Sequence, residues 1–243
     1  MAIRLTSSAA DQYLTFNLVG SAAVTSTFMG WFRLTSDTTV WQNIFFFTVV
    51  GGSQYLCCAQ VEGSGLHLWG INAETSGPIV LTVGTWYHIA VIYDSTVPEA
   101  RLHLNGSLVL TEAAQAAANY TAAQVGAWAG GGDWFNGRVA GLKAWTAALT
   151  VPEIQQEMLA LRPVRTTNLI RFVPAVGGTL ANAVVDLSGN ANLTYGGTPT
   201  IEDGPPIGWG ATPYVYASPS VAGRVIGPGQ IWPTVTLLGS AWR

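Results

Sequence analysis

The sequence predicts an all-β fold: a two-sheet antiparallel jelly-roll sandwich with one short helix and an extended C-terminal arm. Short runs of apolar, β-branched and aromatic residues recur through residues 1–203, each bounded by Gly, Ser, Thr or Asp. One segment, 151–161, has the periodicity of an amphipathic helix. Residues 204–243 are rich in Gly and Pro, which disfavour regular structure. We therefore divide the chain into a β domain, 1–203, and an arm, 204–243.

The predicted strands follow one another at the close spacing that is typical of sandwiches and jelly rolls. They cover residues 13–19, 26–34, 41–50, 54–61, 65–71, 77–83, 85–94 and 100–110, with a later one at 135–145. Asn105 and Gly106 separate two apolar runs. This pair predicts a type I′ hairpin turn, because both turn positions need a positive φ.

The predicted helix begins with a capping box, in which Thr150 is followed three residues later by Glu153. Its apolar stripe consists of Ile154, Met158 and Leu161. We interpret Glu153 as a cap and Glu157 as part of a solvated face, rather than as catalysts. The alanine-rich segment 112–124 leaves two alternatives open: a helix, or a long loop with one helical turn.

Charged residues are scarce, at 9% of the chain, while 49% of residues are hydrophobic. Such a surface favours assembly with other protein subunits. The net charge of -3, without a basic cluster, argues against nucleic acid as a partner. The longest apolar run, 44–50, is far shorter than a bilayer span, so we expect no membrane insertion. No signal peptide is visible at the N terminus.

The cysteines and histidines predict structural roles. Cys57 and Cys58 are adjacent in a predicted strand, so their side chains point to opposite faces and are not expected to bond to each other. We interpret them as buried free thiols rather than as part of a metal site. His67, His88 and His103 fall in strand patterns with no nucleophile motif beside them, and we interpret each as structural.

Aromatic residues distinguish the arm from a polar disordered tail. They are Trp209, Tyr214, Tyr216, Trp232 and Trp242. An uncharged extended arm with aromatic anchors is predicted to dock on a protein surface. The alternatives are a neighbouring subunit or shared assembly, and the chain's own sandwich.

Several segments together resemble one known family. The pair "GTWYHIAVIYD" and "ARLHLNGSLV" closely resembles the laminin G-like, concanavalin A-like jelly-roll family. "FNGRVAGLKAWTAALTVPEIQQEM" is similar to the family's late strand and following helix, and "YLTFNLVGSAAVTSTFMGWFRL" to its early strand pair. "NLIRFVPAVGGTLANAVVDLSGNANLTYGG" resembles a strand that runs to a D-x-S-G-N loop. That segment commonly opens such domains and here follows the helix, so we expect a circularly permuted domain.

The resemblance implies a possible calcium site at the rim of the sandwich. Asp186 matches the loop aspartate that ligates calcium in the family, and Asn190 lies in the same loop. Ala140 and Gly141 stand where the family's late strand often carries acids. Because calcium needs several oxygen ligands, two readings remain. Either calcium binds, or Asp186 and Asn190 satisfy their own turn while Gly189 supplies a positive φ.

The loop "AWAGGGDWFNG", 127–137, is the best candidate for a glycan site. Trp128 and Trp134 could stack on sugar rings while Asp133 accepts hydrogen bonds from hydroxyls. The alternative is that the tryptophans pack against the sandwich edge or a neighbour. No run of carboxylates spaced two apart along a strand is present, so we expect no glycosidase activity and no enzyme.

The leading hypothesis is a non-enzymatic, lectin-like structural or adhesion protein at a virion or extracellular surface. It would be a phage capsid-decoration or tail-associated component that forms a homo-oligomer or assembles with capsid or tail proteins through the arm 204–243. The alternative hypothesis is a carbohydrate-binding module that recognises glycans with its rim loops, with or without calcium.

Overall fold

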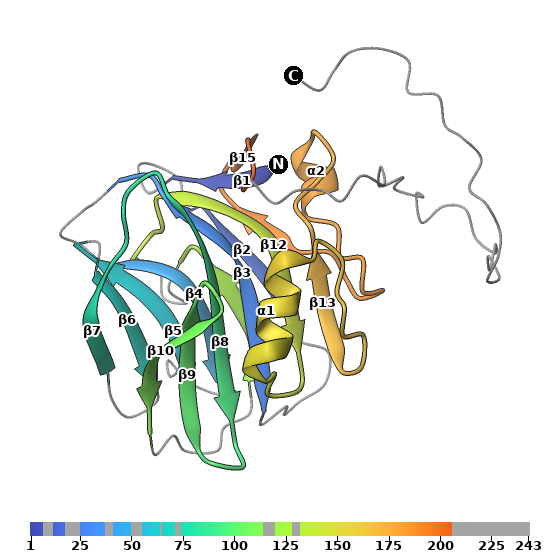
Figure 1. Ribbon diagram of the computed structural model, residues 1–243. Helices are drawn as coiled ribbons and strands as arrows, with labels where there is room; N and C mark the ends of the chain where they lie inside the picture. The colour runs from blue at the N-terminus through green and yellow to red at the C-terminus, as the bar shows by residue number, and fades with distance from the viewer. Residues whose placement is uncertain are drawn as a thin grey trace. The chain divides into compact units, whose positions relative to one another are not determined.

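The structure is a computed structural model of two packed antiparallel sheets, which confirms the predicted sandwich (Figure 1). It describes residues 1–6, 12–17, 25–36, 41–49, 55–63, 65–70, 74–113, 120–127 and 132–205. Met1–Ile207 forms one compact unit. The five aromatic residues of the predicted arm lie outside the described residues.

One sheet has eight strands in the order β10-β9-β8-β3-β12-β1-β15, and β13 also pairs with β12. Their bounds are β1 Ala2–Leu5, β3 Ser26–Leu34, β8 Trp86–Asp94, β9 Glu99–Leu104, β10 Ser107–Glu112, β12 Gly137–Trp145, β13 Leu169–Val173 and β15 Thr200–Glu202. The turn between β9 and β10 is the predicted one, because Asn105 and Gly106 have φ of 50° and 78°.

The other sheet has seven strands in the order β14-β2-β11-β4-β5-β6-β7. Their bounds are β2 Tyr13–Asn17, β4 Gln42–Val49, β5 Tyr55–Glu62, β6 Gly65–Gly70, β7 Glu74–Val80, β11 Tyr120–Val125 and β14 Thr194–Gly196. The strand β11 corrects both alternatives for residues 120–124 of the alanine-rich segment. Residues 120–125 pair with β2 and β4 on either side, and this pairing overrides the helical propensity of alanine.

The main core lies between the inward faces of the two sheets. In β3 successive residues alternate between the two faces, so Phe28 and Phe32 are buried in the core while Trp31 and Arg33 are half-buried. The rings of Phe28 and Phe45 stack across the interior at a centroid distance of 4.2 Å. This alternation decides which side chains each sheet presents on its outward face.

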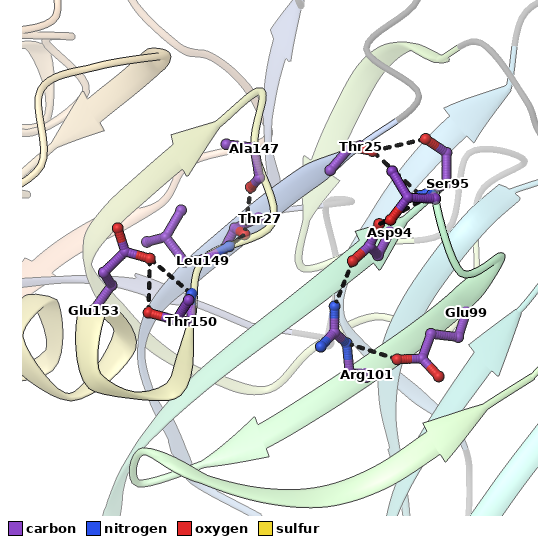
Figure 2. A network of polar contacts seen from close by, with 11 residues as sticks. Thr25, Thr27, Asp94, Ser95, Glu99, Arg101, Ala147, Leu149, Thr150 and Glu153 are labelled. Carbon is purple, nitrogen blue, oxygen red and sulfur yellow. Dashed lines mark hydrogen bonds and ion pairs between the residues drawn. The ribbon is translucent and has the colours of Figure 1, made fainter.

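The helix α1, Val151–Leu159, packs against the outward face of the eight-stranded sheet (Figure 1). Ile154 is fully buried against Met29, Ala90, Ile92, Trp145 and Leu149. The carboxylate of Glu153 accepts hydrogen bonds from the backbone N–H and the hydroxyl of Thr150, which confirms the predicted cap (Figure 2). No helix of the described part is long and apolar enough to span a membrane.

The prediction that Glu157 lies on a solvated face is wrong. Glu157 is 2% exposed and pairs with the only lysine of the chain, Lys143 of β12, at 2.8 Å between Nζ and Oε2. Its other oxygen accepts the backbone N–H groups of Val164 and Arg165. The pattern rule assigns charged helix residues to the solvent side, and it fails here because a cation on the sheet compensates the buried charge.

The segment after α1 completes both sheets. β13 pairs with β12, β14 pairs with β2 and β15 pairs with β1. A short helix, α2 (Leu180–Ala183), was not predicted. The N terminus and β15 lie side by side, with Ala2 opposite Glu202 (Figure 1).

Candidate functional site

Half-buried rings gather on the outward face of the seven-stranded sheet. In β6, Leu66 and Leu68 are buried in the core while His67 and Trp69 between and beyond them are half-buried, so the latter two point outward. In β2, Leu14 is buried and Tyr13 is half-buried for the same reason. The sheet therefore presents aromatic side chains on the side away from the core.

Two groups of rings make up this surface. Trp41, just before β4, meets His67 edge-to-face at a centroid distance of 4.7 Å and Trp69 at 5.6 Å. Trp134 stacks on Tyr13 at a centroid distance of 6.2 Å, with 27° between the ring planes. We call Tyr13, Trp41, His67, Trp69 and Trp134 the aromatic face.

The start of β4 connects the chain segments that carry the two groups. The backbone N–H of Asn43 donates to the carbonyl of Asp133 at 2.6 Å, and its side-chain amide donates to the carbonyl of Ala127 at 2.8 Å. The chain that carries Trp134 therefore runs beside the strand that follows Trp41. Asp133 adopts a φ of 47°, next to Gly132 at 142°, so this stretch turns sharply where it meets β4.

A cross-strand row that begins with the polar residues Thr15 and Gln124 links the two groups. Across the sheet the register aligns Thr15, Gln124, Phe46, Cys58 and Trp69. The side-chain amide of Gln124 lies 3.4 Å from the hydroxyl of Thr15. At one strand spacing per step, Thr15 and Trp69 are about 19 Å apart along this row.

The structure brings together part of the predicted glycan site with rings that the sequence did not single out. Asp133 and Trp134 are half-buried and lie at the aromatic face, whereas Trp128 lies outside the described residues. Tyr13, Trp41 and Trp69 were missed because they are far away in sequence and each falls in or beside an ordinary strand pattern. Their outward positions in the strand alternation were the available signal.

The residues of the predicted calcium site form a closed network with each other. Oδ2 of Asp186 pairs with Nη1 of Arg171 at 2.8 Å, and Oδ1 accepts the backbone N–H groups of Phe172 and Ser188. The amide of Asn190 donates to the carbonyl of Ile170. A cation does not fit here, because the buried guanidinium already neutralises the carboxylate and would repel it. Among the described residues, no group of three or more His, Cys, Asp or Glu could hold a metal.

The late strand β12 is a wall of the sandwich. Ala140 is buried, and Gly141 has a φ of 59° at an irregularity in the pairing of β12 with β3. Neither position offers an oxygen ligand from its side chain. β12 carries two cations. Lys143 pairs with Glu157 of α1, and Arg138 lies on the outward face of the sheet.

Two of the predicted structural histidines are buried in the eight-stranded sheet. Burial, followed by the charges of Lys143 and His103, lowers the pKa of His88 to about 3. Burial and the nearby Arg101 lower the pKa of His103 to about 4. Both imidazoles are therefore neutral at physiological pH.

The fold and the family profile agree. The sequence profile described as the concanavalin A-like lectin/glucanases superfamily, of the laminin G type, matches residues 8–155, more than half of the chain. The chain belongs to this superfamily. No protein of curated function matches the sequence.

Several solved structures have a similar fold at low sequence identity. A candidate carbohydrate-binding protein from Bacteroides ovatus has a TM-score of 0.64 at 18% identity, covering 84% of this chain and 60% of its own. The heptameric SAP-like pentraxin of Limulus polyphemus has a TM-score of 0.52 at 19% identity, covering 63% and 79%. A Trypanosoma rangeli sialidase has a TM-score of 0.50 at 10% identity, covering 56% and 23%. The chain thus spans less than two thirds of the Bacteroides protein.

Proposed function

We propose that this protein is a non-enzymatic carbohydrate-binding module that holds a neutral glycan on the aromatic face. The observation that carries the proposal is the aromatic face itself, whose rings come from four separate segments and share one outward surface. Sugar rings present apolar C–H faces, and these stack on indole and phenol rings. Membership of a lectin-like superfamily and the likeness to a candidate carbohydrate-binding protein support this function.

The polar groups beside the rings suit hydroxyl recognition. Thr15 and Gln124 lie on the row between the two ring groups, and Asp133 lies next to Trp134. Hydroxyl, amide and carboxylate groups fix the orientation of a stacked sugar by hydrogen bonds. The length of the row, about 19 Å, favours a chain of several sugars over a single one.

The distribution of cations favours a neutral glycan. None of the strands of the seven-stranded sheet contains Lys or Arg, and Glu62, Glu74 and Asp133 lie in or beside it. The cations are instead Arg4, Arg33, Arg101, Arg138, Lys143 and Arg171 in the eight-stranded sheet, Arg162 and Arg165 after α1, and Arg224 and Arg243 near the C terminus. A carboxylated or sulfated sugar on the aromatic face would meet acids and no strand cation.

Binding without hydrolysis follows from the acids near the rings. Glycosidases place a pair of carboxylates on either side of the bond that they cleave. Two acids belong to segments that carry rings of the face: Asp133 is next to Trp134, and Glu74 pairs with Trp69 in the register of β6 and β7. They stand at opposite ends of the row and do not form a pair around one sugar bond. Incubation with a bound polysaccharide should therefore release no new reducing ends.

The proposal is tested by calorimetric titration of the protein with a panel of neutral polysaccharides and their acidic counterparts. We expect binding to at least one neutral polysaccharide. Trp134→Ala and Trp69→Ala should each weaken binding by about tenfold, because each removes one stacking surface. Trp134→Phe keeps a ring at the position and should retain most of the affinity.

Tyr195→Ala is the matched control. Tyr195 is 45% exposed on β14 of the same sheet and pairs with Leu14, so it points away from the aromatic face. Its loss should leave the affinity unchanged. The proposal fails if the folded protein binds no neutral polysaccharide, or if binding survives both tryptophan substitutions.

Assembly through the arm 204–243 at a virion or extracellular surface remains a prediction. Its aromatic anchors lie outside the described residues, and the carbohydrate-binding function stands without them. The scarcity of charge and the fold shared with a heptameric pentraxin are compatible with oligomers. Sedimentation of the full chain, with and without residues 206–243, tests the arm directly.

A further inference from the structure

Three arginines stand in a row on the opposite side of the sandwich. Arg33 of β3 lies opposite Arg138 of β12, which lies opposite Arg4 of β1. Their strand neighbours Phe32, Val139 and Ile3 are buried in the core, so the arginines point to the outward face. Directly opposed side chains in antiparallel strands have Cβ atoms about 5 Å apart, and like charges at that spacing destabilise the sheet.

We call Arg4, Arg33 and Arg138 the arginine row. The acidic groups of the chain neutralise only part of its positive charge. Glu202 of β15 pairs with Arg138 and lies 4.0 Å from Nε of Arg4. Arg4 also donates to the side chain of Asn136 at 2.7 Å. The side chain of Arg33 makes no hydrogen bond or ion pair within the described part of the chain. Nε of Arg138 is buried and has no partner there. The guanidinium of Arg33 therefore keeps its N–H donors for an anion, while Arg138 adds positive charge beside it.

We infer that the arginine row binds the carboxylate groups of an acidic polysaccharide. Glu202 shows that the row accepts a carboxylate, since it already holds one beside Arg138. The planar fork of a guanidinium matches two carboxylate oxygens, so the donors of Arg33 can take another. A ligand carboxylate beside Arg33 would thus add a second carboxylate–arginine pair next to the one that Glu202 forms with Arg138.

The surroundings of the row favour a polysaccharide over a protein partner. Trp86 lies directly opposite Arg33, and the hydroxyl residues Thr35 and Thr200 are exposed nearby. An indole ring with hydroxyls suits a sugar that carries the acid. None of the large exposed hydrophobic side chains of the described residues lies in β1, β3, β12 or β15, whereas protein interfaces need an apolar centre.

This surface is independent of the aromatic face. The two are outward faces of different sheets, and the packed core separates them. The arginine row would therefore bind its ligand whether or not a neutral glycan occupies the aromatic face.

The experiment titrates the full-length protein with oligogalacturonate at low and at high salt. The fully methyl-esterified oligomer, which lacks the charges, is the control ligand. We expect binding of the acid form that weakens with salt, and little binding of the ester. Arg33→Gln and Arg138→Gln should each reduce the affinity by about five- to tenfold and reduce its salt dependence.

Arg101→Gln is the matched control, because Arg101 lies on the same sheet but is paired with Asp94 and Glu99. It should leave the affinity unchanged. The inference is overturned if oligogalacturonate does not bind, if Arg33→Gln and Arg138→Gln have no effect, or if Trp134→Ala abolishes binding. Equal binding of single-stranded DNA that requires the same arginines would also overturn the assignment to a polysaccharide.

Discussion

His88 illustrates how a single buried side chain links the sandwich to pH. It is 2% exposed on β8 and packs edge-to-face with Trp31 at a centroid distance of 5.4 Å. Its Nδ1 has no hydrogen-bond partner among the described residues. The neutral imidazole therefore contributes to the fold through packing rather than through a hydrogen bond of Nδ1. Its protonation would place a buried positive charge near Lys143.

We predict that the protein loses stability as the pH falls from 7 to 5. Burial lowers the pKa of His88 to about 3, below the usual value near 6.5 in an unfolded chain. Between these values the unfolded state binds the extra proton, so the free energy of unfolding rises with pH. The contribution of His88 lost at pH 5 is about 2 kcal/mol.

Urea denaturation of the native protein and of His88→Leu at both pH values measures this effect. The variant should lose about 2 kcal/mol less between pH 7 and pH 5 than the native protein. An identical loss in both proteins would show that other groups control the pH dependence.

Thr27 joins three elements at the base of α1. Its hydroxyl donates to the carbonyl of Ala147 at 2.7 Å and accepts the buried N–H of Leu149 at 3.0 Å (Figure 2). The connection from β12 to α1 is thereby held against β3. Leu149 then packs with Ile154 in the small outer core, so the bonds of one hydroxyl position the helix.

Thr27→Val should lower the free energy of unfolding by about 2–4 kcal/mol, because it leaves a buried N–H and a carbonyl without partners while keeping the side-chain shape. Thermal or urea unfolding measures the loss. Thr25→Val is the control, since Thr25 bonds to Ser95 at a more accessible position (Figure 2). It should cost less than about 1 kcal/mol. Equal costs for the two variants would contradict the role given to Thr27.

The elements that sequence predicted best are those specified by local chemistry. β3, the Asn105-Gly106 turn and the cap at Thr150 and Glu153 each follow from alternation, a positive φ or a capping pair. β11 and the burial of Glu157 could not be predicted in this way. Their environment comes from β2 and β4 in one case and from Lys143 in the other, which are remote in sequence.

The prediction of the aromatic face was limited in the same way, because its residues are remote from one another in sequence. Asp133 and Trp134 stand out because glycines surround them, so their loop attracts notice in the sequence. Trp41 and Trp69 belong with them only through the pairing of β4, β5 and β6. A site assembled from several strands of a sheet becomes visible only when the strand order is known.

At the scale of the whole molecule, the positions of β1 and β15 allow the two ends of the sandwich to be joined and the chain to be opened elsewhere. Ala2 of β1 lies opposite Glu202 of β15, so the two ends of the sandwich are adjacent. We predict that a permutant starting at Thr167, with a short Gly/Ser linker from Pro205 to Met1 and ending at Thr166, keeps the fold. Both residues lie in the exposed connection between α1 and β13.

Circular dichroism and cooperative unfolding of this permutant, compared with residues 1–205 in native order, provide the measurement. A matched permutant opened between Val139 and Ala140, inside β12, should fail to fold because it divides a strand that pairs with three others. Failure of the first permutant would mean that the order of the segments, and not only their packing, is needed for folding.

The aromatic face lies on the seven-stranded sheet and the arginine row on the eight-stranded sheet, so the two sides of the sandwich differ chemically. With both surfaces occupied as proposed, one copy would tether a neutral polymer to an acidic one across the thickness of a single sandwich. Mixtures of two such polymers would then stiffen when the protein is added, and Arg33→Gln or Trp69→Ala alone would weaken the effect. A monomer of this fold would act as a crosslinker between unlike polymers, without any oligomer.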